Sequence, residues 1–78
     1  MNTPKAKAPV KMQKVDSSNI HSIGYDPETK TLHVQFQSGA TYHYLNVPEE
    51  THLALDMAES AGRYMNENIK GKFQFVKA

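Results

Sequence analysis

The chain has no cysteine and no long run of apolar residues. The missing cysteines exclude disulfide bonds, cysteine zinc sites and thiol catalysis. No apolar stretch approaches the roughly 18 residues that a membrane helix needs. Residues 1–5 have no apolar stretch after their charge, so they do not resemble a secretory signal. We therefore expect a cytoplasmic protein that does not interact with a membrane.

The sequence also lacks the patterns that usually mark an enzyme. It contains no Ser-His-Asp order with a recognisable nucleophile elbow and no glycine-rich phosphate loop. Paired carboxylates in an apolar setting, the usual acid and base of a hydrolase, are absent as well. We therefore predict a protein that is not an enzyme, and we expect no cofactor.

Charge is unevenly distributed, although the net charge of the 78 residues is only +1. Residues 1–14 carry four lysines and no acid, residues 15–62 have a net charge of −6, and residues 63–78 have a net charge of +3. Segment 1–14 is rich in lysine, alanine and proline and has little to bury, so it predicts a disordered basic tail. A nonspecific nucleic-acid arm is the alternative for this segment. Residues 15–78 then form a single folded domain.

Three segments alternate apolar and polar residues, which is the period of a half-buried β-strand. They cover residues 18–25, 31–37 and 40–46. Segment 26–30 predicts a turn, because its proline presets φ at the second turn position and its aspartate can accept a backbone hydrogen bond. The pattern predicts a three-stranded antiparallel meander.

The loop between the second and third strands decides which way two tyrosines point. A two-residue loop, Ser38-Gly39, turns Tyr42 and Tyr44 to the polar face, but it needs a positive φ at the serine. A three-residue loop that ends at Gly39 needs a positive φ only at the glycine, and it turns both tyrosines toward the apolar face. We prefer the second register, in which Gly39 is a structural turn residue.

The same register places His33 directly opposite His43 on the other face of the sheet. The two rings could share a metal ion, but a zinc site usually has three or four protein ligands. We therefore expect no metal site, and we interpret the pair as part of a polar, pH-sensitive face. The other residues expected on this solvent-facing side are Ser22, Gly24, Gln35 and Thr41.

Two short helices are expected after the sheet, over residues 49–59 and 61–69. Pro48 is a structural residue that suits a helix start, and the two acids after it oppose the positive end of the helix dipole. Small and apolar residues at spacings of three or four form one core stripe. Ser60 is expected to cap the second helix, and Gly71 to follow its end.

The elements together predict an α+β fold. It consists of a three-stranded antiparallel β-meander packed against one or two C-terminal helices. Residues 72–76 alternate again and predict a possible short edge strand. The free edges of such a sheet leave pairing across a dimer open.

A series of short motifs runs through the chain in order. They are Ser17-Ser18, Ile23-Gly24-Tyr25-Asp26, Leu32-His33-Val34-Gln35-Phe36, Gly39, Tyr42-His43-Tyr44, Val47-Pro48, Ala58-Glu59-Ser60-Ala61-Gly62, Asn66 and Ile69-Lys70. This series resembles the KTSC family, named for a domain at the C-terminus of some lysyl-tRNA synthetases. The family also includes short stand-alone proteins of bacteria and phages. The attachment to a synthetase implies RNA binding as an expected function, by association.

Five residues around the junction of the two helices form the main candidate site: Ser60, Gly62, Arg63, Asn66 and Lys70. A Ser-x-Gly turn presents N–H groups at a helix N-terminus, which is a natural place for an anion. Two of the five side chains are basic. The alternative is a capped helix–helix corner with solvated charges.

Tyr42 and Tyr44 are the second candidate site, since aromatic rings can stack on nucleic-acid bases. The preferred register favours the other interpretation, in which both rings pack in the core.

These observations predict a non-enzymatic binding module for RNA, of tRNA-like structure, or for another phosphate-bearing ligand. Two alternatives stay open. The acidic body predicts a protein-interaction module, for example an accessory or phage factor that acts on a host protein. The turn at Ser60 allows a pocket for a small nucleotide.

Overall fold

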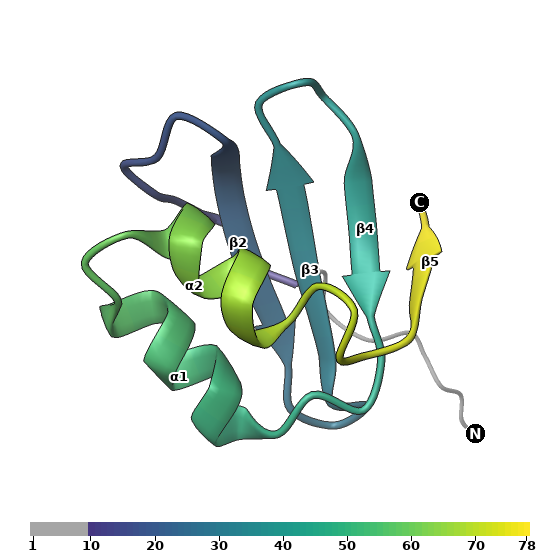
Figure 1. The fold of residues 1–78 in the computed structure, drawn as a ribbon. Coiled ribbons are helices and arrows are strands. Elements are labelled where there is room, and N and C mark those ends of the chain that lie inside the picture. The colour runs from purple at the N-terminus through teal and green to yellow at the C-terminus, as the bar shows by residue number, and fades with distance from the viewer. Residues whose placement is uncertain (1–9) are drawn as a thin grey trace.

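The computed structural model describes residues 10–78 and shows an antiparallel sheet with two helices packed on one face (Figure 1). The strands lie in the order β1-β2-β3-β4-β5. The elements are β1 (Gln13–Lys14), β2 (Ile20–Asp26), β3 (Thr31–Phe36), β4 (Thr41–Tyr44), α1 (Glu49–Met57), α2 (Ala61–Asn68) and β5 (Phe75–Lys77). No helix in this part of the chain is long and apolar enough to cross a bilayer.

The α+β class is confirmed, but the sheet has five strands where the sequence predicts a meander of three. The three predicted strands are β2, β3 and β4. At the C-terminal end, β5 pairs with β4 and overlaps the possible edge strand predicted over residues 72–76, but it begins three residues later. At the other edge, β1 falls inside segment 1–14, which is predicted as a disordered tail, and pairs with β2. The remainder of that predicted tail, residues 1–9, lies outside the described residues.

The loop between β3 and β4 has the predicted three-residue form. The N–H of Phe36 donates to the carbonyl of Ala40 over 2.8 Å, and Gly39 has a φ of +98°. A positive φ at glycine has no side-chain penalty, so the loop closes in this register. As a result Tyr42 and Tyr44 pair with Val34 and Leu32 on the face that the helices cover.

The core lies between that face of the sheet and the two helices. Its largest fully buried side chains come from the strands, from both helices and from the segments that flank them: Ile20, Leu32, Leu55, Met65, Ile69, Val34 and Val47. Burial of apolar side chains of this size is the main stabilising contribution in a small domain. The helical stripe predicted at spacings of three or four is confirmed in part: Leu55, Met65 and Ile69 are buried, whereas Thr51, Ala58 and Gly62 are half-buried.

The helix boundaries follow from local signals. Pro48 is extended, with ψ at 151°, and stands just before α1. The chain leaves the helical conformation again at Ala58, and Ser60 caps α2 by accepting a hydrogen bond from the N–H of Arg63. Gly71 has a φ of +78°, as its predicted role at the end of the helix requires. The helices end at Met57 and Asn68, slightly before the predicted ends.

The outer face of the sheet is covered at one point, where the sequence predicts only solvent. Val10–Met12, which we call the N-terminal strap, crosses over the buried residue Gly24. A Cβ at Gly24 would lie 2.7 Å from the sulfur of Met12 and 2.7 Å from a methyl group of Val10. Ser22 is only 3% exposed, and its hydroxyl donates to the side-chain carbonyl of Gln35. The prediction of a fully solvated outer face is therefore wrong at these two strand positions.

Candidate functional site

The N-terminal end of α2 and the loop before β2 enclose a groove of about 430 Å³. We call it the corner groove. Its lining is almost entirely polar and consists of Asp16, Ser17, Ser18, Asn19, Glu59, Ser60, Gly62, Arg63 and Asn66. Four of the five residues predicted around the helix junction therefore lie on one surface. The other wall, residues 16–19, is not predicted as a site by the sequence.

The helix end that faces the groove keeps hydrogen-bond donors available. The hydroxyl of Ser60 accepts from the N–H of Arg63 over 3.2 Å, and the carbonyl of Ser60 accepts from the N–H of Tyr64. The first N–H groups of a helix have no partner within the helix. In α2 these are the N–H groups of Ala61 and Gly62, and of these two residues Gly62 lines the corner groove.

Gly62 of α2 lies beside the opposite wall of the groove, at a distance that a methyl group would fill as an ordinary van der Waals contact. A Cβ at this position would lie 3.4 Å from the hydroxyl oxygen of Ser17 and 3.7 Å from the Cβ of Asn19. Hydrogen bonds within residues 17–20 hold this wall in place, because the Ser17 hydroxyl accepts from two backbone N–H groups, each over 3.1 Å. The side-chain amide of Gln37 donates to the carbonyl of Ser17 and holds the loop against the sheet.

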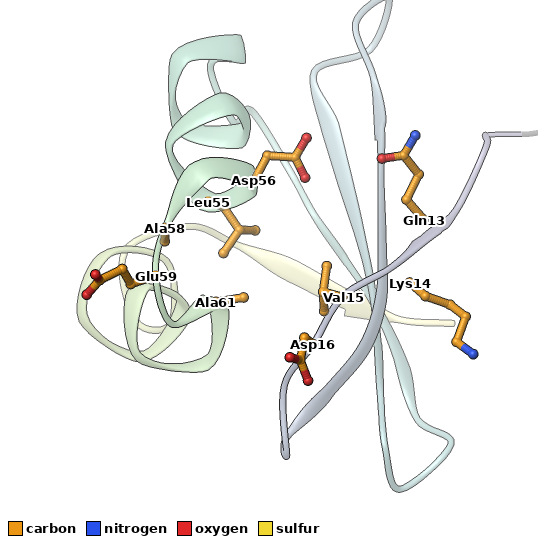
Figure 2. A pocket seen from close by; sticks show the side chains of 9 residues that line it. All are labelled: Gln13, Lys14, Val15, Asp16, Leu55, Asp56, Ala58, Glu59 and Ala61. Carbon is orange, nitrogen blue, oxygen red and sulfur yellow. The ribbon is translucent and has the colours of Figure 1, made fainter.

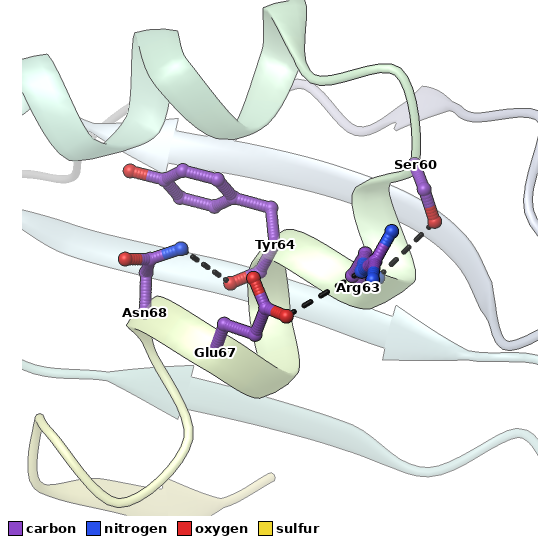
Figure 3. A network of polar contacts seen from close by, with 5 residues as sticks. All are labelled: Ser60, Arg63, Tyr64, Glu67 and Asn68. Carbon is purple, nitrogen blue, oxygen red and sulfur yellow. Dashed lines mark hydrogen bonds and ion pairs between the residues drawn. The ribbon is translucent and has the colours of Figure 1, made fainter.

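The charges of the corner groove are mixed. Arg63 forms an ion pair with Glu67, one helical turn further on, over 3.4 Å (Figure 3). The two side chains are 78% and 62% exposed. Asp16 and Glu59 contribute carboxylates to the lining. An arginine, two carboxylates, hydroxyl groups and helix N–H groups together suit a ligand that has both an anionic group and hydroxyl groups.

Lys70, the fifth predicted residue, does not lie in the corner groove. Its ammonium group is 5.2 Å from the centre of the Phe36 ring, in a cation–π arrangement at the far end of α2. Such contacts at exposed positions stabilise a fold by about 0.5–1 kcal/mol. The position of Lys70 therefore supports a structural role.

Tyr42 and Tyr44 also lie away from the groove. Tyr44 is buried, and burial raises its pKa, with Tyr42 as the second cause. The ring of Tyr42 stacks on Phe75 of β5 at 5.2 Å between centroids. The prediction that both rings pack on the covered side of the sheet is confirmed. A base would have to displace Phe75 to stack on that side of Tyr42.

His33 and His43 are paired across the sheet, as the register predicts. Their ring centroids are 4.1 Å apart and the planes are tilted by 39°. Among residues 10–78, no group of three or more His, Cys, Asp or Glu side chains is placed to hold a metal ion.

A second groove, of about 360 Å³, runs between β1 and α1. Figure 2 shows Leu55 and Asp56 of α1 facing the segment that contains Val15 and Asp16. It adjoins the corner groove, since Asp16 lines both. The sequence does not indicate this groove, because one of its walls is formed by residues that carry no alternating pattern.

Tyr25 connects β2 to the start of α1 through contacts that the sequence does not indicate, and we call these contacts the tyrosine latch. The hydroxyl of Tyr25 donates to the carbonyl of Val47 over 2.5 Å, and its ring stacks on His52 at 4.7 Å between centroids. Burial raises the pKa of Tyr25, and the negative charge of Glu49 raises it further. The latch ties β2 to the start of α1. The partners lie far apart in sequence, so no local signal reveals them.

Comparison with known proteins gives a consistent result. The model of the KTSC domain matches residues 16–73. A protein of Tsukamurella paurometabola is 46% identical over 65 residues, which cover 83% of this chain and 97% of that protein. A crystal structure of a KTSC domain protein from Yersinia pestis is 46% identical, covers 90% of this chain and 99% of its own, and superposes with a TM-score of 0.87. A lysine–tRNA ligase of Nostoc punctiforme is 42% identical over 62 residues, which cover 80% of this chain and 11% of the ligase.

Proposed function

The chain belongs to the KTSC domain family, and from this premise we propose that it is a non-enzymatic module that binds a nucleotide unit of RNA in the corner groove. The observation that supports this most directly is the composition of that groove. Helix N–H groups, the guanidinium of Arg63 and the amide of Asn66 share one surface with carboxylates and hydroxyl groups. The phosphate and the ribose hydroxyl groups of a ribonucleotide would each find a complementary group on this surface.

The phosphate would lie at the N-terminal end of α2. Helix N-termini bind anions because unpaired N–H groups and the positive end of the helix dipole coincide there. The side chain of Arg63 starts one turn inside this end, and its pair with Glu67 is exposed. An exposed ion pair stabilises a protein by about 0–1 kcal/mol, so a phosphate competes with Glu67 at little cost.

The sugar would lie against Asp16 or Glu59. Carboxylates repel phosphate, but they accept hydrogen bonds from ribose hydroxyl groups, and the 2′-hydroxyl is the group that distinguishes RNA from DNA. The size of the groove, about 430 Å³, lies within the range of small-ligand sites. It suits one nucleotide of a single strand or of a loop rather than a duplex.

The relatives supply an independent reason to consider RNA. Three of the similar proteins are named lysine–tRNA ligases, in which the matching segment is about a tenth of the whole chain. A domain attached to an enzyme that acts on tRNA is well placed to contact RNA. The attachment is an association and does not identify the bound nucleotide.

Fluorescence anisotropy with a labelled single-stranded RNA and the DNA of the same sequence tests the proposal. We expect RNA to bind with a dissociation constant of about 10–100 µM at low salt, which is typical of small contact areas, and DNA to bind more weakly. Unlabelled AMP as a competitor distinguishes a nucleotide pocket from an RNA-only site. No binding of RNA or AMP at about 1 mM protein contradicts the proposal.

Two variants locate the site. Arg63→Gln should weaken RNA binding by about five-fold or more, because it removes a charge-assisted hydrogen bond to phosphate. Lys77→Gln removes the same charge from β5, outside the groove, and should have a smaller effect. Equal losses for the two variants would show that general charge, and not the corner groove, determines binding.

A further inference from the structure

Two large apolar side chains are exposed side by side on α1. Leu53 is 48% exposed and Met57, in the last turn, is 83% exposed. They are four residues apart, so they lie on one face and are neighbours. At about 100° per residue, both point within about 20° of the direction opposite Leu55, which is buried against the sheet. We call this pair the α1 ridge.

Acidic residues flank the α1 ridge on both sides. On the helical wheel Glu49 and Asp56 lie to one side of it and Glu50 lies to the other, and all three are exposed. The helix contains no lysine or arginine that could neutralise them. The exposed face of α1 is therefore an apolar strip between carboxylates, which is an unusual composition for a solvated helix surface.

We propose that the α1 ridge is a docking site for a protein partner that presents a basic amphipathic helix. Such a helix has apolar side chains that cover Leu53 and Met57, with lysines or arginines on both sides that face the carboxylates. Methionine suits this role because its flexible thioether adapts to differently shaped partners. This site is independent of the proposed RNA site, since it lies on the solvent side of α1 and not at the end of α2.

The three carboxylates beside the α1 ridge disfavour RNA, an anionic membrane and a second copy of the chain as partners. The phosphates of RNA and an anionic lipid surface would both be repelled by the three carboxylates. A second copy of the chain would place identical acidic rims against each other in a two-fold contact. A basic apolar helix is the occupant for which both the charge and the apolar strip are complementary.

A titration of the ¹⁵N-labelled full-length chain with two synthetic peptides tests the proposal by NMR. One peptide is an amphipathic helix of leucine and lysine, and the other has glutamate at every lysine position. We expect the lysine peptide to shift amide signals of residues 49–57 with a dissociation constant of about 100 µM, a value typical of small interfaces. The glutamate peptide should cause no comparable shifts. Equal binding of both peptides, or shifts centred on another element, would overturn the proposal.

Matched variants assign the binding to the ridge. Met57→Ser should weaken binding of the lysine peptide by about three-fold or more, because it removes an apolar contact from the centre of the site. Val76→Ser is the control, since Val76 is a half-exposed apolar residue on β5. The double variant Glu50→Lys with Asp56→Lys should reverse the preference toward the glutamate peptide. Equal effects of the two serine variants, or no reversal of preference, would refute the assignment, provided that the spectra show folded protein.

Discussion

The N-terminal strap should be displaced by a single methyl group at Gly24. A Cβ there would lie 2.7 Å from the sulfur of Met12 and 2.8 Å from the backbone carbonyl oxygen of Lys11. Comfortable carbon contacts lie at about 3.5–4.0 Å, so the alanine needs about 1 Å of extra room. The methionine side chain can rotate away, but the carbonyl moves only with the chain. In Gly24→Ala we therefore expect the strap to separate from β2.

The size of the effect follows from two opposing contributions. In the interior of a strand, alanine is favoured over glycine by about 0.5–1 kcal/mol. Crowding in a packed site costs about 1–3 kcal/mol. The crowding here is relieved by releasing a short segment, so its cost cannot exceed the packing energy of that segment. We expect a net loss of about 1 kcal/mol in the free energy of unfolding, measured by chemical denaturation.

Deletion of residues 1–12 provides the decisive comparison. The truncation removes the three atoms nearest to the new methyl group, so Gly24→Ala should stabilise the truncated chain by about 0.5–1 kcal/mol. In the full-length chain the same substitution should lower the free energy of unfolding, and amide hydrogen exchange of residues 13–15 should become faster. If the substitution has the same sign in both chains, the strap does not pack on Gly24 and the reasoning is refuted.

Three further substitutions test the local structure by chemical denaturation. Ser60→Ala removes the cap on the N–H of Arg63 and should cost about 1 kcal/mol, with Ser60→Asp as a near-neutral control. Tyr25→Phe loses the hydrogen bond to Val47 and should cost about 0.5–1.5 kcal/mol. Because the pKa of Tyr25 is raised in the folded state, this residue makes stability fall as pH rises above about 10, and the phenylalanine should reduce that slope. Gly39→Ala forces a side chain into a φ of +98° and should cost about 1–2 kcal/mol without changing contacts, so an unchanged stability would contradict the loop geometry.

The central part of the sheet was predictable because local rules decide it. A strand alternates with period two, and only Gly39 in its loop tolerates a positive φ, so the register of β3 and β4 follows from one residue. The capping of α2 by Ser60 was predictable for the same reason. In each case a side chain or a missing side chain acts on backbone groups within a few residues.

The edges of the sheet and the second wall of the corner groove depend on distant contacts. β1 has only two residues, and its position is set by pairing with β2 and by the space above Gly24. Neither appears as a pattern in residues 10–14. Likewise, Ser17 and Gly62 line the corner groove together because the fold brings them close, and they are far apart in sequence. Tertiary packing, not propensity, decides such elements.

The four lysines of residues 1–14 are the alternative nucleic-acid arm, and a site confined to the corner groove predicts a different salt dependence from such an arm. In the corner groove a single arginine stands beside two carboxylates, so the groove offers charge to about one phosphate. For single strands, each phosphate contact contributes about −0.7 to the slope of log affinity against log salt. A site confined to the groove therefore predicts a slope near −0.7, measured by anisotropy between low and moderate salt. A slope several times steeper would assign most of the affinity to the lysines of residues 1–14, and deletion of that segment would then abolish binding while Arg63→Gln would not.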